Sequence, residues 1–376
     1  MAGLASPLPA AAVRSPSQRL GGAAFWQKEG KPLRVHRIGV QRTSTTALGP
    51  LASHGPSPTC PTTTLIQPRR LGGLLSALTA ILILTLLGAG SASAATRYDA
   101  VFRGDPTGST DVTASLARFL QSHDGQRVAL AHGASYRVSG LVFTARNLTV
   151  DFRGARLLSN SRGAPVLRIQ TSTNVTLNRP WVVGTGYQWI PSIQWEHGIY
   201  VDGGAGITLN HPITRNTHGD GIYVGMFHDG TEPARSVVIR SPDIRLASRS
   251  GIAPVAGEVS IHGGRIYRVG MHAINFEVNV STGARSIRGV VDGVDIRRYG
   301  DLPIDSGNYA VAALGWSTAI KPSMVIQNLT GDQLRITVGW TADVVVRNNV
   351  SDTASTATFP GCDSVTFAAN TRIKRG

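Results

Sequence analysis

The chain has 376 residues, of which 43 are glycine, only 6% are aromatic and two are cysteine. Two cysteines exclude the disulfide framework of a small secreted scaffold. The formal net charge is +15 at pH 7, but residues 96–376 hold 28 basic and 21 acidic residues, a net +7. Because no nucleic-acid motif and no lysine-rich run is present, we expect no nucleic-acid partner; a basic exported protein would instead attract an anionic polymer.

The N-terminal quarter is not expected to join the fold. Residues 1–64 are rich in Pro, Ser, Thr and Ala without periodicity, so they are disordered or precede the true translation start. Residues 65–94 combine Arg69-Arg70, an apolar run from Leu74 to Leu87, and Ala92-Ser93-Ala94. This order is typical of a bacterial-type signal peptide cleaved after Ala94, which predicts a secreted, extracellular protein without stable membrane association. A retained signal anchor is the alternative, although the run is shorter than the roughly 20 residues that span comfortably.

One helix is expected, from Asp111 to Ser122. Thr110 or Asp111 can cap its N-terminus, and Gly125 follows its end. Its apolar stripe consists of Val112, Leu116, Phe119 and Leu120. This helix precedes a series of repeats, and a cap at the end of a repeat array covers the first apolar layer.

Short β-branched strands recur over most of the remaining chain, at residues 147–151, 174–178, 206–210, 236–240, 258–262, 324–327, 343–347 and 364–367. The steps from Val237 to Val259, Val325 to Val344 and Val344 to Val365 are 22, 19 and 21 residues. Self-similar strands at this period predict an all-β solenoid, a right-handed parallel β-helix over residues 95–376 with the helix as its N-terminal cap.

Longer steps of 32 residues from Val175 to Ile207 and 30 from Ile207 to Val237 indicate loops that leave the coil. Repeat proteins place binding surfaces on such loops, so we expect the functional site between Trp181 and Asp243.

A second strand family begins at His197-Gly-Ile, Asp220-Gly-Ile, Ser250-Gly-Ile and His272-Ala-Ile, with Asn308-Tyr-Ala as a further candidate. Strand periodicity puts the isoleucines inward. Two outward columns are then predicted: Tyr200, Tyr223, Ala253 and Asn275 in one, and Asp202, Gly225, Val255 and Glu277 in the other.

Three N-terminal segments carry a resemblance to a known family. They are Gly104-Asp-Pro-Thr-Gly-Ser-Thr-Asp with the following helix, Gly133-Ala-Ser-Tyr-Arg-Val138, and Leu148-Thr-Val-Asp-Phe-Arg-Gly154. They resemble the opening of pectate-lyase-superfamily proteins. The resemblance covers residues 99–376 and implies the pectin-lyase-like parallel β-helix. The superfamily includes lyases, polygalacturonases, epimerases, tailspikes and non-catalytic surface proteins, so the chemistry is not implied.

The segment Asn216-Thr-His-Gly-Asp-Gly-Ile222 resembles the Asn-Thr-Asp-Gly segment of polygalacturonases, with His218 in place of their first Asp. An adjacent Asp-Asp pair, which those hydrolases also need, is absent from this sequence. Hydrolysis of the polygalacturonase type is therefore the less favoured alternative.

Independently of the family, the alignment places His197 and Asp220 at equivalent points on successive coils. A His beside a carboxylate suits proton transfer, and elimination from a uronate needs a base, a carboxylate neutraliser and an acid. His197 or His218 could be the base, Arg215 the neutraliser, and Tyr200 or Tyr223 the acid. Asp220 can instead bond local backbone in a glycine-rich turn, which is the structural alternative.

Further substrate contacts are expected from Trp189 and Trp195, which could stack on sugars, and from the outward residues Asp202 and Glu277. The sequence commits to no cofactor and no metal site, although loop carboxylates such as Glu196 could bind Ca²⁺. The hypothesis is a secreted protein that cleaves an acidic polysaccharide by a lyase-type reaction; a non-catalytic carbohydrate-binding or cell-surface β-helix is the alternative. The sequence does not predict the oligomeric state.

Overall fold

The computed structural model describes residues 97–225, 233–255, 257–278, 287–304, 307–315, 323–339 and 341–376. The expected extension at 1–64 and signal peptide at 65–94 lie outside these residues, so both stay predictions. Of the helices within the described ranges, none has the length and apolar character of a membrane span.

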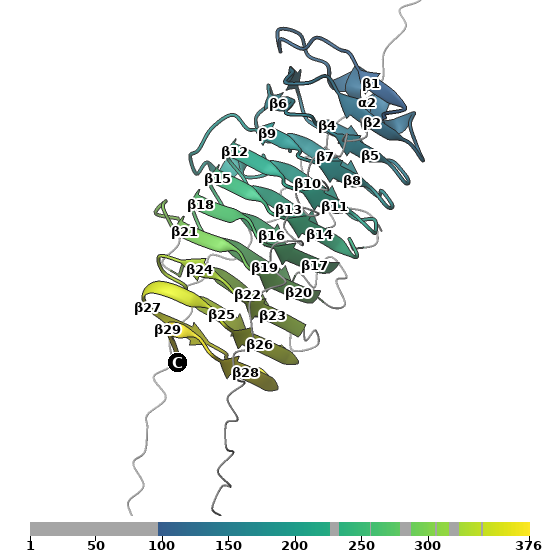
Figure 1. Cartoon of the computed structure of the whole chain (residues 1–376). Helices are drawn as coiled ribbons and strands as arrows, with labels where there is room; N and C mark the ends of the chain where they lie inside the picture. Colours follow the sequence, from purple (N-terminus) through teal and green to yellow (C-terminus); the bar gives the residue numbers. More distant parts are fainter. Residues whose placement is uncertain are drawn as a thin grey trace, which may run out of the picture. The chain divides into compact units, whose positions relative to one another are not determined.

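The predicted helix is present as α2, Thr113–Gln121, slightly shorter than expected. Val112, Leu116 and Leu120 are buried. The N-cap residue is Val112, which has no capping side chain, and not Thr110 or Asp111 as expected. The carboxylate of Asp111 still accepts the backbone N–H of Thr113 at 2.8 Å and so satisfies a free donor at the helix start. Figure 1 shows α2 at the end of the strand array where β1 and β2 begin, so it caps the first layers.

The strands form two sheets of parallel pairs, one of 11 strands and one of 18 that comprises two ladders. The first ladder contains β1 (Ala100–Phe102), β2 (Arg127–Leu130), β5 (Thr149–Asp151), β8 (Thr176–Asn178), β11 (Thr208–Asn210), β14 (Val237–Arg240), β17 (Gly257–His262), β20 (Ile287–Asp292), β23 (Ser323–Gln327), β26 (Asp343–Arg347) and β28 (Ser364–Ala368).

The second ladder contains β3 (Ser135–Val138), β6 (Arg156–Ser159), β9 (Trp181–Val183), β12 (Ile213–Thr217), β15 (Asp243–Ala247), β18 (Arg265–Val269), β21 (Asp295–Tyr299), β24 (Thr330–Gly331), β27 (Val350–Thr358) and β29 (Thr371–Arg375). The third contains β4 (Leu141–Phe143), β7 (Leu167–Gln170), β10 (Ile199–Asp202), β13 (Ile222–Gly225), β16 (Ile252–Pro254), β19 (Ile274–Val278), β22 (Val311–Gly315) and β25 (Ile336–Gly339). A short 3₁₀ helix, η1 (Pro191–Ile193), lies between β9 and β10.

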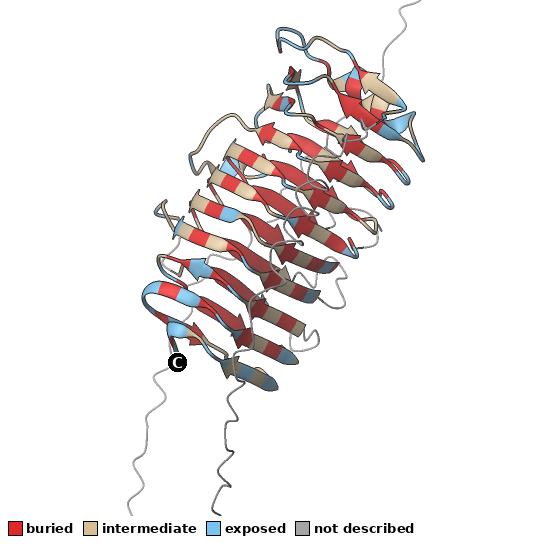
Figure 2. Cartoon of the chain, in the orientation of Figure 1, coloured by how far each residue is buried: buried red, intermediate tan, exposed pale blue. Residues whose placement is uncertain are grey.

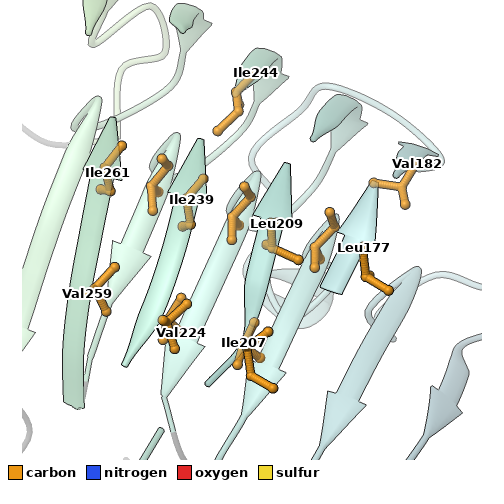
Figure 3. Close-up of a cluster of buried hydrophobic side chains, with 14 of the residues drawn as sticks. Leu177, Val182, Ile207, Leu209, Val224, Ile239, Ile244, Val259 and Ile261 are labelled. Carbon is orange, nitrogen blue, oxygen red and sulfur yellow. The ribbon is translucent and has the colours of Figure 1, made fainter. Parts of the chain in front are cut away.

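Successive strands such as β11, β12 and β13 belong to different ladders, so one coil of chain contributes one strand to each. All-parallel pairing of this kind is a parallel β-helix, the fold that the sequence resemblance implies. Its interior is a continuous stack: Val150, Leu177, Leu209, Ile239 and Ile261 pair in register. Each is at most 1% exposed. Figure 2 shows buried residues along every ladder, and Figure 3 shows Leu177, Leu209, Ile239 and Ile261 within this core.

Burial of each such aliphatic side chain contributes about 1.5–3 kcal/mol. The stack, repeated coil after coil, is therefore the main source of the fold's stability.

The predicted series of strands omits β1 and β2 at the start of the first ladder and β20 within it. β20 lies between β17 and β23, and its Gly289 is opposite Val259 on one side and Met324 on the other. A Cβ on Gly289 would lie 2.6 Å from Met324 Sδ and 2.7 Å from Phe276 Cε1, so these larger side chains fill the space. Of the two inward positions of β20, only Val291 carries an aliphatic side chain, so its sequence does not show the pattern of the other repeats. The expected pairing of Val325 with Val344 is also wrong by one residue, since Val344 pairs with Met324.

The inward column of the third ladder is confirmed: Ile199, Ile222, Ile252 and Ile274 pair in register and are completely buried. The alignment of the further candidate strand, Asn308-Tyr-Ala, is wrong by one residue, because Ile274 pairs with Val311 and not with Ala310. Tyr309, rather than Asn308, therefore occupies the place equivalent to His272. The segment that precedes β22 is longer than those before β13, β16 and β19, so counting from the previous coil misplaces the strand.

Close backbone approach explains the repeated Gly-Ile of this ladder. A Cβ at Gly198 would lie 2.5 Å from the carbonyl oxygen of Gly221, and one at Gly221 would lie 2.6 Å from that of Gly251. The residue before each glycine, His197 or Asp220, stands at the corner where the chain enters the third ladder. The corner residues of successive coils are thus held one above the other.

Candidate functional site

Polar and aromatic side chains are buried together on the outer face of the third ladder. Tyr200, Tyr223, Ala253 and Val255 form a hydrophobic cluster separate from the main core. The predicted parity is therefore correct, but these outward side chains are covered: Tyr200 is 3% and Tyr223 6% exposed. A β-helix does not need a second buried layer outside its coil, so this layer is the feature that requires a functional explanation.

His197 and Asp220 form the centre of this layer, from corners of successive coils. Nδ1 of His197 lies 3.2 Å from Oδ2 of Asp220 and 3.1 Å from the backbone nitrogen of Asp220. The neutral ring accepts that N–H in one tautomer and donates to Oδ2 in the other. The other oxygen of Asp220 accepts the N–H of Ser250 at 2.8 Å. Nε2 of His197 is buried without a hydrogen-bond partner. A buried nitrogen left unpaired is costly, which makes it a candidate for contact with a ligand.

The electrostatics of the pair follow from burial. Loss of solvent lowers the pKa of His197 below its ordinary value, and the nearby Asp220 offsets only part of this effect. Burial raises the pKa of Asp220, but the Arg249 guanidinium, His197 and the Ser250 N–H outweigh it, so the net pKa is lowered. At neutral pH the imidazole is therefore neutral and the carboxylate is charged.

Two tyrosines surround the imidazole. The His197 ring stacks on Tyr223 with centroids 4.5 Å apart, and Tyr200 meets Tyr223 edge-on at 5.0 Å. Tyr200 donates its hydroxyl to Asp202 at 3.1 Å, and Asp202 also accepts Nε of Arg168 at 2.8 Å. Burial is the main cause that raises the pKa of both tyrosines, so both phenols keep their protons at neutral pH.

Arg249 links the centre to the next coils. Its guanidinium lies 3.7 Å from Asp220 and 3.9 Å from Glu277, whose carboxylate accepts Nδ2 of Asn275 at 2.5 Å. Burial raises the pKa of Glu277, and Arg249 offsets part of that rise. Sequence reasoning missed both Arg249 and Arg168. The sequence signal for Arg249 is that it directly precedes Ser250-Gly-Ile. The signal for Arg168 is that it lies opposite Tyr200 on the neighbouring strand.

Trp195 borders the same group and is 39% exposed, which is unusual for so large an apolar side chain. Its ring meets His197 edge-on at 5.9 Å, and the Arg249 guanidinium lies 6.0 Å from the ring centroid. Of the predicted residues, His197, Asp220, Tyr223, Tyr200, Asp202, Glu277 and Trp195 thus lie in one connected network. Trp189 is half-buried in the loop between β9 and β10.

The contacts of His218 and Arg215 lie elsewhere. Nδ1 of the buried His218 is 2.7 Å from the carbonyl oxygen of Gln188, so Nδ1 carries the proton and donates it to that loop. Arg215 projects from β12 of the second ladder and is bonded to Asp243 at 2.5 Å. Neither contact joins the His197 network, and Arg249 is the cation closest to the role expected of Arg215.

Within the described ranges, no group of three or more His, Cys, Asp and Glu side chains is arranged to hold a metal ion. The carboxylates of the network are instead bonded to arginines, amides and backbone N–H groups.

No protein-family model and no curated protein matches the chain. Among solved structures, the Agl-KA catalytic domain is similar at 10% identity and a TM-score of 0.41, over 71% of this chain and 66% of that one. ORF18 of Geobacillus virus E2 is similar at 13% identity and a TM-score of 0.41, over 77% of this chain and 61% of that one. PfbA, a surface adhesin of Streptococcus pneumoniae, is similar at 9% identity and a TM-score of 0.39, over 72% of this chain and 89% of that one. The chain spans less than two thirds of the length of the first two.

Proposed function

We propose that this protein cleaves an acidic polysaccharide by lyase-type elimination at the His197 network. The observation that carries the proposal is the buried His197–Asp220 pair with its unpartnered Nε2, set between Tyr223 and the exposed Trp195. Clusters of buried titratable groups with perturbed pKa values are typical of catalytic sites. A tryptophan beside them offers an apolar face to a sugar ring.

The reaction needs three groups, and the network supplies one for each. When Nδ1 of His197 donates to Asp220, Nε2 carries a lone pair and can take the proton from C5 of a uronate residue. The electrons of that C–H bond form the C4–C5 double bond while the C4–O bond breaks. Tyr223, whose phenol is protonated at neutral pH, can donate its proton to the leaving oxygen. Arg249 replaces Arg215 as the group that neutralises the substrate carboxylate.

Arg249 already faces two carboxylates, Asp220 and Glu277. Because burial raises the pKa of Glu277, this residue takes up a proton at a higher pH than an ordinary glutamate. Once protonated, it leaves Arg249 with one charged partner, and a uronate can be the second. We therefore expect a substrate carboxylate to bind more tightly as the pH falls through the pKa of Glu277.

Hydrolysis of a glycosidic bond is the second candidate, because two carboxyl groups of the network have pKa values displaced in opposite directions. That of Glu277 is raised and that of Asp220 is lowered. Such a pair suits a general acid and a general base. Glu277 would then protonate the leaving oxygen and Asp220 would activate water.

The products separate the alternatives. The purified protein is incubated with polygalacturonate, alginate and a glycosaminoglycan; elimination gives unsaturated ends that absorb in the ultraviolet, whereas hydrolysis gives reducing ends alone. Tyr223→Phe is the informative variant, because it keeps the ring stack and removes only the hydroxyl. We expect it to lose at least tenfold in rate. Binding without either product would support the non-catalytic alternative, and export by the expected signal peptide would bring the protein to such polymers.

A further inference from the structure

The loop from Gly184 to Gly198, between β9 and β10, is bonded along both of its ends to the following coil. The N–H groups of Gly184 and Gly186 donate to the carbonyls of Arg215 and Asn216 at 2.9 and 3.0 Å. At the far end, the carbonyl of Glu196 accepts the N–H of Gly219 at 2.9 Å. The loop is therefore built as a fixed part of the wall beside the His197 network.

Within this loop, Glu196 is a fully buried carboxylate that the proposed chemistry does not use. Its Oε1 accepts the backbone N–H of Thr185 at 2.5 Å, and its Oε2 accepts the Thr185 hydroxyl at 2.7 Å. No Lys or Arg pairs with it among the ion pairs of the described residues. Burial of a carboxylate is costly unless its oxygens are bonded, so both bonds to Thr185 are needed to keep Glu196 inside.

Space for this carboxylate is reserved by a glycine. A Cβ at Gly184 would lie 2.7 Å from Oε1 of Glu196 and 2.4 Å from the carbonyl oxygen of Asn216. The start of the loop and the Glu196 side chain therefore fit together as one unit, closed between Thr185 and Glu196.

The chain neighbours of Glu196 are His197, which carries the unpartnered nitrogen Nε2, and Trp195, whose ring meets that of His197 edge-on. The N–H of His197 donates to the carbonyl of Trp195 at 2.8 Å, which folds the three residues into a γ-turn. In this turn the Glu196 side chain is bonded to the loop, Trp195 is exposed, and His197 lies against Asp220. A turn held at its central residue fixes the directions of both neighbours.

We propose that Glu196 is a positioning residue. Its bonds to Thr185 hold the turn so that the Trp195 ring and Nε2 of His197 face the same sugar residue of an acidic polysaccharide. The inference rests on the proposed function for the identity of that ligand. His218, through its bond to Gln188, is a second anchor of the same loop.

The test uses two variants at one position. In Glu196→Gln the amide oxygen can still accept the Thr185 N–H, and the amide nitrogen can donate to the Thr185 hydroxyl. In Glu196→Ala both bonds are lost. Hydrogen exchange of peptides covering residues 185–197, which needs no substrate, should accelerate at least tenfold in the Ala variant and stay near wild type in the Gln variant. Exchange in the β13 and β14 strands serves as the internal reference for an intact fold.

Kinetics on the polymer that the wild type cleaves give the second readout. Glu196→Ala should raise KM and lower kcat together, each by at least fivefold, because Trp195 and His197 are both displaced, and Glu196→Gln should restore both. Unchanged exchange and kinetics in Glu196→Ala would overturn the inference, as would equal losses in the two variants. Faster exchange in the Ala variant alone, with no polymer cleaved or bound by the wild type, would support the anchor and contradict the proposed function.

Discussion

The imidazole of His197 lies flat on the phenol ring of Tyr223, with ring centroids 4.5 Å apart and planes 14° from parallel. The two residues come from successive coils, since His197 precedes β10 and Tyr223 lies on β13, so the register of the β-helix sets their contact. The stack removes His197 from water and leaves its Nε2 without a partner. Regular packing thus produces a buried, chemically capable group on the outside of the coil.

The free energy of unfolding should decrease as the pH falls, in part because of His197. Its pKa is lowered on folding, so below the ordinary value of 6.5 the unfolded chain takes up a proton that the folded protein refuses. The contribution is present above that value and is lost as the pH falls toward the folded pKa. Urea unfolding at about pH 7.5 and about pH 5.5 should show a smaller decrease in His197→Gln than in wild type.

His132→Gln is the control for that comparison, because His132 is exposed. Its pH dependence should match that of the wild type. Glu277, whose raised pKa acts in the opposite direction, is common to all three proteins and cancels in the difference. An identical slope for His197→Gln and wild type would contradict the neutral, buried imidazole.

The inward isoleucine column should respond in proportion to the volume removed. Ile222 is completely buried between Ile199 and Ile252, so Ile222→Ala should cost about 2–5 kcal/mol and Ile222→Val about 0.5–1.5 kcal/mol. Thr208→Ala, on the outward side of β11, should change stability by less than about 0.5 kcal/mol. Chemical denaturation that ranks Thr208 above Ile222 would mean that the inward and outward faces are exchanged.

Gly289 and Met324 should be coupled. Gly289→Ala places a methyl group within 2.6 Å of the Met324 thioether and should cost about 1–3 kcal/mol. A double-mutant cycle tests the coupling. Gly289→Ala should lower the free energy of unfolding by less in a Met324→Val background, where the smaller side chain leaves room for the methyl group. If the effects of the two substitutions on the free energy of unfolding were strictly additive, the Met324 side chain would not occupy the space beside Gly289.

Arg249 should depress the pKa of His197, since its positive charge disfavours the imidazolium. Arg249→Gln is therefore expected to raise the pH at which the His197 ring signals titrate by NMR. It should also destabilise the fold by about 3 kcal/mol, because it leaves Asp220 without its cation. Arg245→Gln, at a guanidinium 43% exposed and paired with Asp243, is the matched control and should do neither. A lowered His197 titration in Arg249→Gln would refute the proposed charge arrangement.

The sequence predicted those parts of the fold that depend on local periodicity. Repeats with aliphatic inward residues, such as those containing Leu209 and Ile222, were identified with their parity. The coil of β20 was missed because Gly289 leaves one of its two inward positions empty and Met324, from the next coil, fills the space. That compensation acts between residues distant in sequence, so no single strand pattern reveals it.

The site was predictable where it follows the ladder register. His197, Asp220 and the two tyrosines were expected to be neighbours because they occupy equivalent places on successive coils. Arg249 lies one residue outside the aligned strands, and only its long side chain brings it between Asp220 and Glu277. Arg215 and His218 were grouped with the site because they are close in sequence, but the corner at Gly219 directs the chain from the second ladder into the third and separates their contacts.

We propose that His197 abstracts a proton from a bound uronate. The initial rate of unsaturated-product formation by His197→Gln and His132→Gln, with the polymer that the wild type cleaves, tests this role. Both substitutions remove one imidazole, but only the first removes the buried ring stacked on Tyr223. We expect a loss of at least a hundredfold for His197→Gln, with polymer binding retained, and wild-type rates for His132→Gln. Unsaturated product at the wild-type rate from His197→Gln would contradict it.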